Sequence, residues 1–172
     1  SGSSEFLSVG KFSTPRNPQA LRGNPEALRR LWQHTGMTDE DYIETTVQSL
    51  CSGDLDDLQL KLVTGDDGLN GIICRPRVQK PGLAFAGYYE YIKPWRVQII
   101  GASETMYLES LPPRLREKRI REVAGLDIST FIVTKGITPL EEFRTECEKR
   151  GVPLFSTPSM SSTTITRTTY FL

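Results

Sequence analysis

The residues best suited to chemistry are three cations in the segment 75–82, whose sequence is RPRVQKPG. Guanidinium groups bind phosphate or carboxylate through paired hydrogen bonds. The segment follows a short apolar run at 72–74, and loops at strand ends are where α/β sheets usually bind ligands. The pattern therefore predicts a candidate anion site at Arg75, Arg77 and Lys80. The alternative interpretation is a solvated connection whose prolines fix the direction of the chain.

A second group that could bind a partner is aromatic and follows directly in the sequence. Tyr88, Tyr89, Tyr91 and Trp95 precede Arg96, and clustered aromatics beside arginine are typical of protein interfaces. We predict that one or two of them lie at a subunit or domain contact, while the others pack inside the domain. Aromatic side chains also stack on bases, but neither an RNA-reading motif nor a basic balance accompanies these.

The signatures of the common catalytic and metal sites are missing from the sequence. It contains no G-x-x-x-x-G-K-[ST] phosphate loop, no G-x-G-x-x-G dinucleotide motif, no CxxC and no HExxH. His34 is the only histidine, so a Ser–His or Cys–His site would have to use it. We therefore predict no catalytic residue, no metal ligand and no cofactor in this chain.

Composition narrows the class of protein. The 172 residues are 37% hydrophobic and 24% charged, and 21 basic residues balance 21 acidic ones. This is the composition of a globular domain, and zero net charge gives no general attraction to nucleic acid or anionic membranes. No apolar run approaches the roughly 20 residues of a membrane helix. Three widely spaced cysteines, at 51, 74 and 147, predict reduced thiols and a cytoplasmic location.

The elements that would position these residues alternate between strand and helix patterns. Apolar runs predict strands at 58–63, 72–74, 97–101, 131–134 and 152–155. Helical patterns lie between them, the clearest opening at Thr138, where Thr138, Pro139 and Glu141 suit a capping box. The strand–helix–strand unit at 131–155 predicts parallel pairing. The fold class predicted is α/β, a three-layer α/β/α arrangement with a small mixed or parallel sheet.

The ends of the chain differ from this central pattern. Residues 1–6 read like a cloning scar, and residues 7–43 form an extension that is rich in Pro, Gly, Asn and Arg and is predicted to be partly helical. The domain itself is predicted to span 44–172. Its last segment, 157–172, is rich in Ser and Thr, which lowers helix propensity, but we predict a helix there because apolar residues recur at suitable positions.

Several segments, taken in order, resemble the N-terminal domain of bacterial HPr kinase/phosphorylases. The sequence KPGLAFAGY at 80–88 resembles RPGLxLAGY of that family, and RVQIIG at 96–101 resembles RIQILG. The stretch 104–111 is similar to the helix E-x-x-Y/F-L-x-x-L, and FIVTKG at 131–136 is similar to IIVTRG. The resemblance covers about 45–172.

The resemblance implies a parent enzyme that phosphorylates a serine of the phosphocarrier HPr with ATP or pyrophosphate, removes that phosphate by phosphorolysis, and controls carbon catabolite repression. It implies that the nucleotide, Mg²⁺ and catalytic residues lie in a C-terminal P-loop domain beginning after Leu172. It also implies a fold similar to the first domain of Mur ligases, and hexameric parents.

The chain itself is then expected to be a non-catalytic regulatory or architectural domain. Its partners would be the kinase domain of the same parent, HPr through that parent, and further copies of the chain, with no nucleic acid and no membrane. Two alternatives remain open at this point: a domain that senses a small anion or nucleotide, and a pure assembly module.

Overall fold

A mixed sheet of order β2-β6-β5-β4 organises the part of the chain that the computed structural model describes, residues 43 and 45–172. Its strands are β2 (Lys61–Thr64), β4 (Val97–Ile100), β5 (Thr130–Val133) and β6 (Leu154–Ser156). β4, β5 and β6 run parallel, whereas β2 is antiparallel to β6. A separate antiparallel pair joins β1 (Thr45–Thr46) to β3 (Ile72–Ile73).

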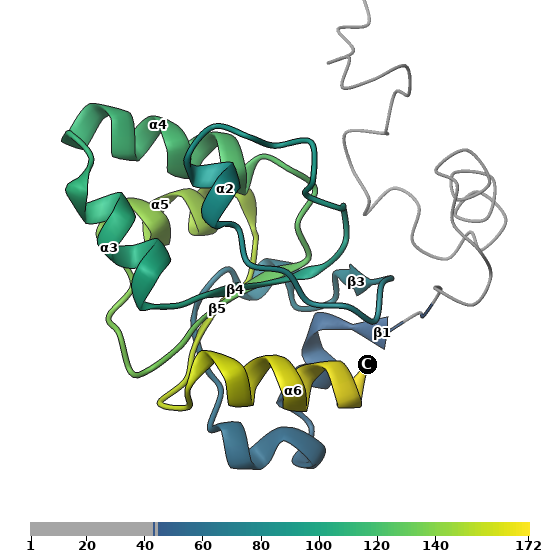
Figure 1. The fold of residues 1–172 in the computed structure, drawn as a ribbon. Helices are drawn as coiled ribbons and strands as arrows, with labels where there is room; N and C mark the ends of the chain where they lie inside the picture. Colours follow the sequence, from purple (N-terminus) through teal and green to yellow (C-terminus); the bar gives the residue numbers. More distant parts are fainter. Residues whose placement is uncertain (1–42, 44) are drawn as a thin grey trace, which may run out of the picture. The chain divides into compact units, whose positions relative to one another are not determined.

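Helices cover both faces of this sheet, which confirms the three-layer α/β/α prediction (Figure 1). On one face lie α2 (Gly82–Phe85), α3 (Ala102–Ser110), α4 (Pro113–Ala124) and α5 (Glu141–Arg150). On the other face lie the 3-10 helices η3 (Val47–Cys51) and η4 (Gly53–Leu58) and the C-terminal helix α6 (Ser161–Phe171). A further 3-10 turn, η5 (Asp66–Gly68), follows β2. The predicted likeness to Mur ligases stays a prediction.

The two inner strands explain why the core has two halves. All residues of β4 and β5 are buried, and successive side chains of a strand point to opposite faces. Phe131 and Val133 therefore pack with α2 to α5, whereas Ile132 packs with η3, η4 and α6. Such continuous burial is typical of parallel strands between two helical layers.

The connection from β5 through α5 to β6 has the predicted parallel form. Gly151 ends α5 at a φ of 63°, which glycine adopts without strain. The start of α5 differs from the prediction, because the helix begins at Glu141 and Leu140 is its N-cap. Ile137 and Leu140, which precede the helix, both pack on the core beside α5. The predicted capping box is therefore wrong.

One predicted strand has a different start in the structure. The strand expected at 58–63 begins at Lys61, because Leu58 is the fully buried last residue of η4. Leu58 fills the core beside η3 and η4, where burial does not require membership of the sheet. The strand predicted at 72–74 is confirmed, and it pairs with β1 outside the main sheet.

The free edge of β4 is covered by the segment that follows β3. Gln79 forms a parallel bridge with Gln98. Its N–H donates to the carbonyl of Val97 (2.9 Å), and its carbonyl accepts the N–H of Ile99 (2.7 Å). Of the predicted extension 7–43, only Ile43 is among the described residues, and its N–H donates to the carbonyl of Cys74. The cloning scar predicted at 1–6 and the rest of the predicted extension, with His34, lie outside them. No helix among the described residues is long and apolar enough to cross a membrane.

Candidate functional site

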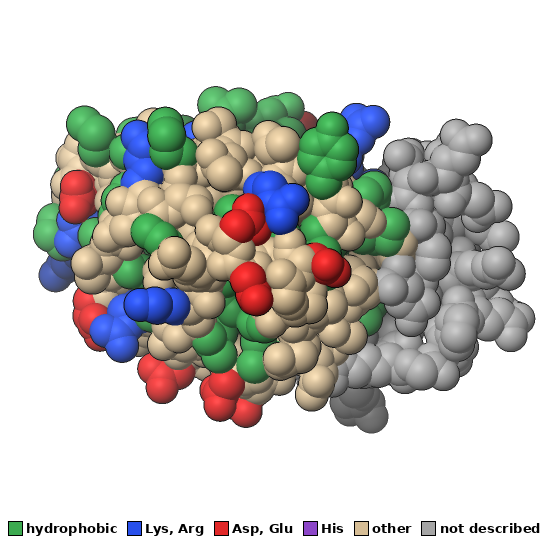
Figure 2. Space-filling model, turned by 90° about the horizontal axis from the view of Figure 1, so that it is seen from below, with side chains coloured by type: hydrophobic (Ala, Val, Ile, Leu, Met, Phe, Trp, Pro, Cys, Tyr) green, Lys and Arg blue, Asp and Glu red, His purple; other side chains and the backbone are tan. Residues whose placement is uncertain are grey.

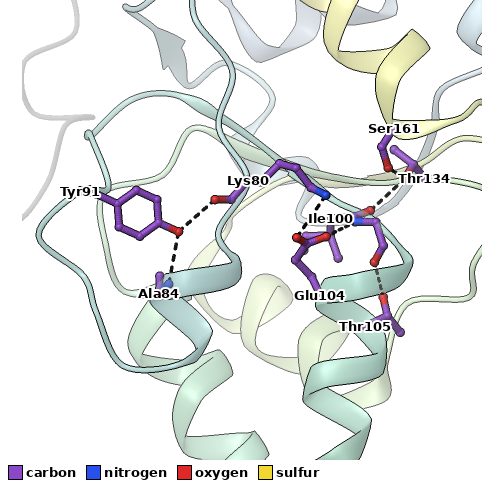
Figure 3. A network of polar contacts seen from close by, with 9 residues as sticks. Lys80, Ala84, Tyr91, Ile100, Glu104, Thr105, Thr134 and Ser161 are labelled. Carbon is purple, nitrogen blue, oxygen red and sulfur yellow. Dashed lines mark hydrogen bonds and ion pairs between the residues drawn. The ribbon is translucent and has the colours of Figure 1, made fainter.

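Polar side chains gather where β4 and β5 end and where α3 and α6 begin (Figure 3). Four positions supply them: Lys80 follows the edge segment at Gln79, Glu104 lies in the first turn of α3, Thr134 follows β5, and Ser161 is the first residue of α6. This is the carboxyl end of the parallel strands, where α/β sheets most often bind ligands. We call these four residues the carboxyl-edge network.

The centre of the network is the carboxylate of Glu104, whose side chain is only 8% exposed. One oxygen lies 3.2 Å from the Lys80 ammonium, and the other accepts the backbone N–H of Gly101 at 2.9 Å. Gly101 is the N-cap of α3 and Glu104 its third residue, so this bond satisfies a donor at the helix start and places negative charge near the positive end of the helix dipole.

The second part of the network is a pair of hydroxyls beside Gly101. Thr134 donates its hydroxyl to the carbonyl of Ile100 (3.1 Å) and lies 2.6 Å from the Ser161 hydroxyl, which therefore acts as donor to Thr134. A Cβ at position 101 would lie only 2.6 Å from the oxygen of Ser161. A side chain at position 101 would therefore displace the Ser161 hydroxyl.

The chemistry that this arrangement permits is the holding of an anion. An ammonium group and a backbone N–H at a helix start together bind negative charge. Here the protein's own carboxylate fills that position, so the two charges of Lys80 and Glu104 neutralise each other. The exposed side of the pair is Lys80, whose side chain is 39% exposed.

Of the three cations predicted to form an anion site, Lys80 belongs to the carboxyl-edge network. Arg75 is buried and follows Cys74, whose N–H donates to the carbonyl of Trp95 before β4 begins. Lys80 lies beyond Gln79, which pairs along β4 as far as Ile99. Arg77 lies between them and is exposed. The segment bends at Pro76 and pairs with β4 at Gln79, and an anion site at these three residues stays a prediction.

The aromatic residues predicted to form an interface divide into exposed and internal ones. Tyr88 is 52% exposed and its ring stacks on that of Tyr91, whereas Trp95 is only 3% exposed. Tyr91 donates its hydroxyl to the carbonyl of Lys80 and accepts the N–H of Ala84 (Figure 3). Tyr91 thereby fixes the chain on both sides of Gly82, whose Cβ position would lie 3.3 Å from the Glu104 carboxylate.

Tyr89 joins this aromatic segment to α4. It donates its hydroxyl to the carboxylate of Glu122 and accepts a bond from the guanidinium of Arg119 at 3.0 Å. The hydrogen bond from Tyr89 is the main reason that the pKa of Glu122 lies below its ordinary value; Lys118 and Arg119 add to the effect. Of the four aromatics, Tyr88 is therefore the one that the structure leaves mostly exposed.

Sequence reasoning missed Glu104, Thr134 and Ser161 as members of a site. The spacing Gly101-x-x-Glu104 is a capping pattern with glycine in place of serine, and it was the one available signal. Thr134 and Ser161 carry no local signal, because they meet only through the packing of α6 beside β5. Among residues 43 and 45–172, no three His, Cys, Asp or Glu side chains lie close enough together to hold a metal ion.

Comparison with known proteins identifies a family, and several of its members, to which this sequence is similar. It matches the family described as HPr Serine kinase N terminus over residues 45–172. The HPr kinase/phosphorylase of Geobacter sulfurreducens is 39% identical over 130 residues, which are 76% of this chain and 41% of that protein. The HPr kinase/phosphorylase of Clostridium beijerinckii is 34% identical over 119 residues, 69% of this chain and 39% of that protein. The chain thus spans about two fifths of the length of these relatives.

A solved structure also aligns with the chain. It contains the CBS and DRTGG domains of the regulatory region of Clostridium perfringens pyrophosphatase, complexed with the activator diadenosine tetraphosphate. The alignment covers 83% of this chain and 56% of that one, with a TM-score of 0.49 and 18% sequence identity.

Proposed function

Because the chain belongs to the HPr Serine kinase N terminus family, we propose that it is a non-catalytic regulatory or architectural domain of an HPr kinase/phosphorylase. The parent would phosphorylate and dephosphorylate a serine of HPr in carbon catabolite regulation. The partners in this proposal are the remainder of the parent, HPr through that remainder, and further copies of the chain. ATP or pyrophosphate and Mg²⁺ would bind outside this chain.

The observation that carries the proposal is the internal pairing of the carboxyl-edge network. A phosphoryl-transfer site needs cations directed at the transferred phosphate and a group that accepts the serine proton. Here Lys80 is held by Glu104, and Thr134 is held by Ile100 and Ser161. The sequence also lacks the phosphate loop that would bind a nucleotide. This network supports packing of α3 and α6, and it does not supply the groups for transfer.

The direct test is an assay of the purified chain with HPr and Mg²⁺, with ATP in one reaction and pyrophosphate in another. We expect no phosphoserine on HPr by mass spectrometry, and no release of phosphate from phosphorylated HPr when inorganic phosphate is added. The full-length Geobacter sulfurreducens relative, assayed beside it, is the positive control. Transfer by the chain above the level without protein would refute the non-catalytic role.

The architectural part of the proposal is tested by assembly. Tyr88 and Leu83 are 52% and 60% exposed and lie together, because the N–H of Tyr88 donates to the carbonyl of Leu83. If the chain contributes to assembly through this surface, light scattering at increasing concentration should show dimers or larger species, and Leu83→Ser with Tyr88→Ser should reduce them. A strict monomer at high concentration counts against an architectural role for this chain alone.

A second candidate function is sensing of a small anion. It is favoured by the way in which Lys80 and the N–H of Gly101 already hold one carboxylate. An external phosphate would have to displace Glu104, so Glu104→Gln should increase the thermal shift produced by sugar phosphates or nucleotides, and Lys80→Ala should abolish it. Arg77→Ala, a change at an exposed cation outside the network, is the matched control. If neither the native chain nor Glu104→Gln shifts with any of these ligands, sensing at this site is refuted.

A further inference from the structure

The helix α6 is attached to the sheet in an unusual way, because its most deeply buried side chains are polar. Thr164 and Thr168 are fully buried, whereas the apolar residues Ile165 and Phe171 are only partly buried. On the opposite face of the sheet, α4 buries Ile120 and Val123 completely. Burial of apolar area supplies most of the attraction between a helix and the core beside it. We therefore expect α6 to be held more weakly on its face of the sheet than α4 is on the other.

The two threonines occupy equivalent positions one turn apart, but their hydroxyls differ. Thr164 donates its hydroxyl to the carbonyl of Met160 at 2.9 Å. The hydroxyl of Thr168 is buried and has no hydrogen-bond partner among the described residues. A buried hydroxyl without a partner destabilises the state that buries it, because its hydrogen bond to water is lost without replacement. Undocking of α6 would restore that bond.

The remaining attachments of α6 are at its ends and on its surface. Its N-cap residue, Met160, makes no side-chain cap, and its first turn contains no acidic residue. Arg167 binds Asp57 of η4 with two bonds of 2.7 and 3.0 Å, but these side chains are 42% and 51% exposed. Exposed ion pairs contribute little and weaken as salt is added. In Figure 2, the face over η4 and α6 carries scattered charges and no continuous hydrophobic cover.

We propose that α6 is a releasable cover, a helix that leaves the sheet as one unit while β4, β5 and β6 stay folded. The closed state is held by the bonds of Arg167 to Asp57 and to the carbonyl of Asp54, by the Ser161–Thr134 hydroxyl bond and by partly buried apolar side chains of the helix. It is opposed by the buried hydroxyl of Thr168. Release uncovers the face of the sheet that carries Ile99 and Ile132. The chain would thereby switch a hydrophobic surface between hidden and accessible states, a regulatory capacity that does not depend on the proposed function.

Native-state hydrogen exchange of the full chain tests the proposal directly. We expect the amides of α6 to exchange about 100-fold faster than those of β4 and β5, with one common rate of opening along the helix. Thr168→Val keeps the shape and removes the hydroxyl, so α6 should exchange about tenfold more slowly. Thr164→Val is the matched control; it removes a satisfied hydrogen bond and should leave the rate unchanged or faster. Arg167→Ala should make exchange about threefold faster.

Each contrary result overturns the proposal. Equal protection of α6 and the inner strands would show that the helix opens only when the whole domain unfolds. Protection that falls gradually from Ser161 to Phe171 would show fraying from the end and not release of a unit. If Thr168→Val and Thr164→Val change the exchange of α6 equally, the unpaired hydroxyl does not control opening. The first two readouts use the native chain, so they stand even if a variant fails to fold.

Discussion

The buried carboxylate of Glu104 offers the sharpest test of how the carboxyl-edge network stabilises the domain. Lys80 and Glu104 form a pair at 3.2 Å in which Glu104 is 8% exposed and Lys80 is 39% exposed. Glu104 has a second bond, to the N–H of Gly101, which Lys80 does not share. Replacing each residue by alanine, alone and together, separates the ion pair from the helix cap.

The expected magnitudes follow from this geometry. The Coulomb attraction at 3.2 Å is about 5 kcal/mol at an effective dielectric constant of about 20, but removal of Glu104 from water cancels most of it. We expect a coupling free energy of about 1 kcal/mol between the two side chains. Glu104→Ala should lower the free energy of unfolding by about 2.5 kcal/mol, because the cap is lost as well. Lys80→Ala should cost about 1.5 kcal/mol and the double variant about 3 kcal/mol.

Urea unfolding followed by circular dichroism at pH 7 measures all four chains. Glu104→Gln is the matched control, since its amide oxygen can still accept the N–H of Gly101; it should cost less than Glu104→Ala. A coupling free energy below about 0.3 kcal/mol, which is the usual limit of additivity, would refute the ion pair as a source of stability. Equal losses for Glu104→Gln and Glu104→Ala would refute the role of the cap.

Three further outcomes are expected. The hydrogen bond from Tyr89 lowers the pKa of Glu122, so this carboxylate stabilises the fold above about pH 5. Its contribution is lost as the pH falls through the lowered pKa. Urea midpoints measured between about pH 5 and 3 should therefore fall less steeply for Tyr89→Phe than for the native chain. Burial raises the pKa of Cys147 to about 12, so the stability of the fold should decline as the pH rises above the pKa of the thiol in the unfolded chain, about 8.5. Melting curves of Cys147→Val should lack this decline. Lys135 has a φ of 62°, so Lys135→Gly should raise the free energy of unfolding by up to about 1 kcal/mol; a lower urea midpoint would contradict the assigned strain.

The layered fold was accessible from the sequence because its strongest signals are local. Three consecutive apolar residues at 131–133, followed by a helix-length segment before the next strand, are compatible with few arrangements other than a parallel crossover. The start of α5 was less accessible. Thr138, Pro139 and Glu141 favour a helix locally, but the burial of Ile137 and Leu140 depends on distant residues and determines the outcome.

The site was less predictable than the fold, for a related reason. The cations at 75–80 are close in sequence, yet Arg75 is buried whereas Arg77 and Lys80 are exposed. Glu104 looked like an ordinary helix residue, and its burial arises only because Gly82 and Gly101 admit its carboxylate between them. Spacing along the chain predicts neighbours on a helix, whereas here the contacts join three different elements.

The coverage of the outer edge of β4 by Gln79 also affects how the protein behaves at high concentration. An open strand edge invites pairing with another molecule and growth into aggregates. Gln79 occupies that edge with two backbone hydrogen bonds. A strand of another molecule could therefore pair with this sheet only at β2. That border has four residues, includes a charged lysine at position 61, and is interrupted by a register shift between Leu62 and Thr64. Both edges of the sheet thus resist edge-to-edge pairing between copies of the chain.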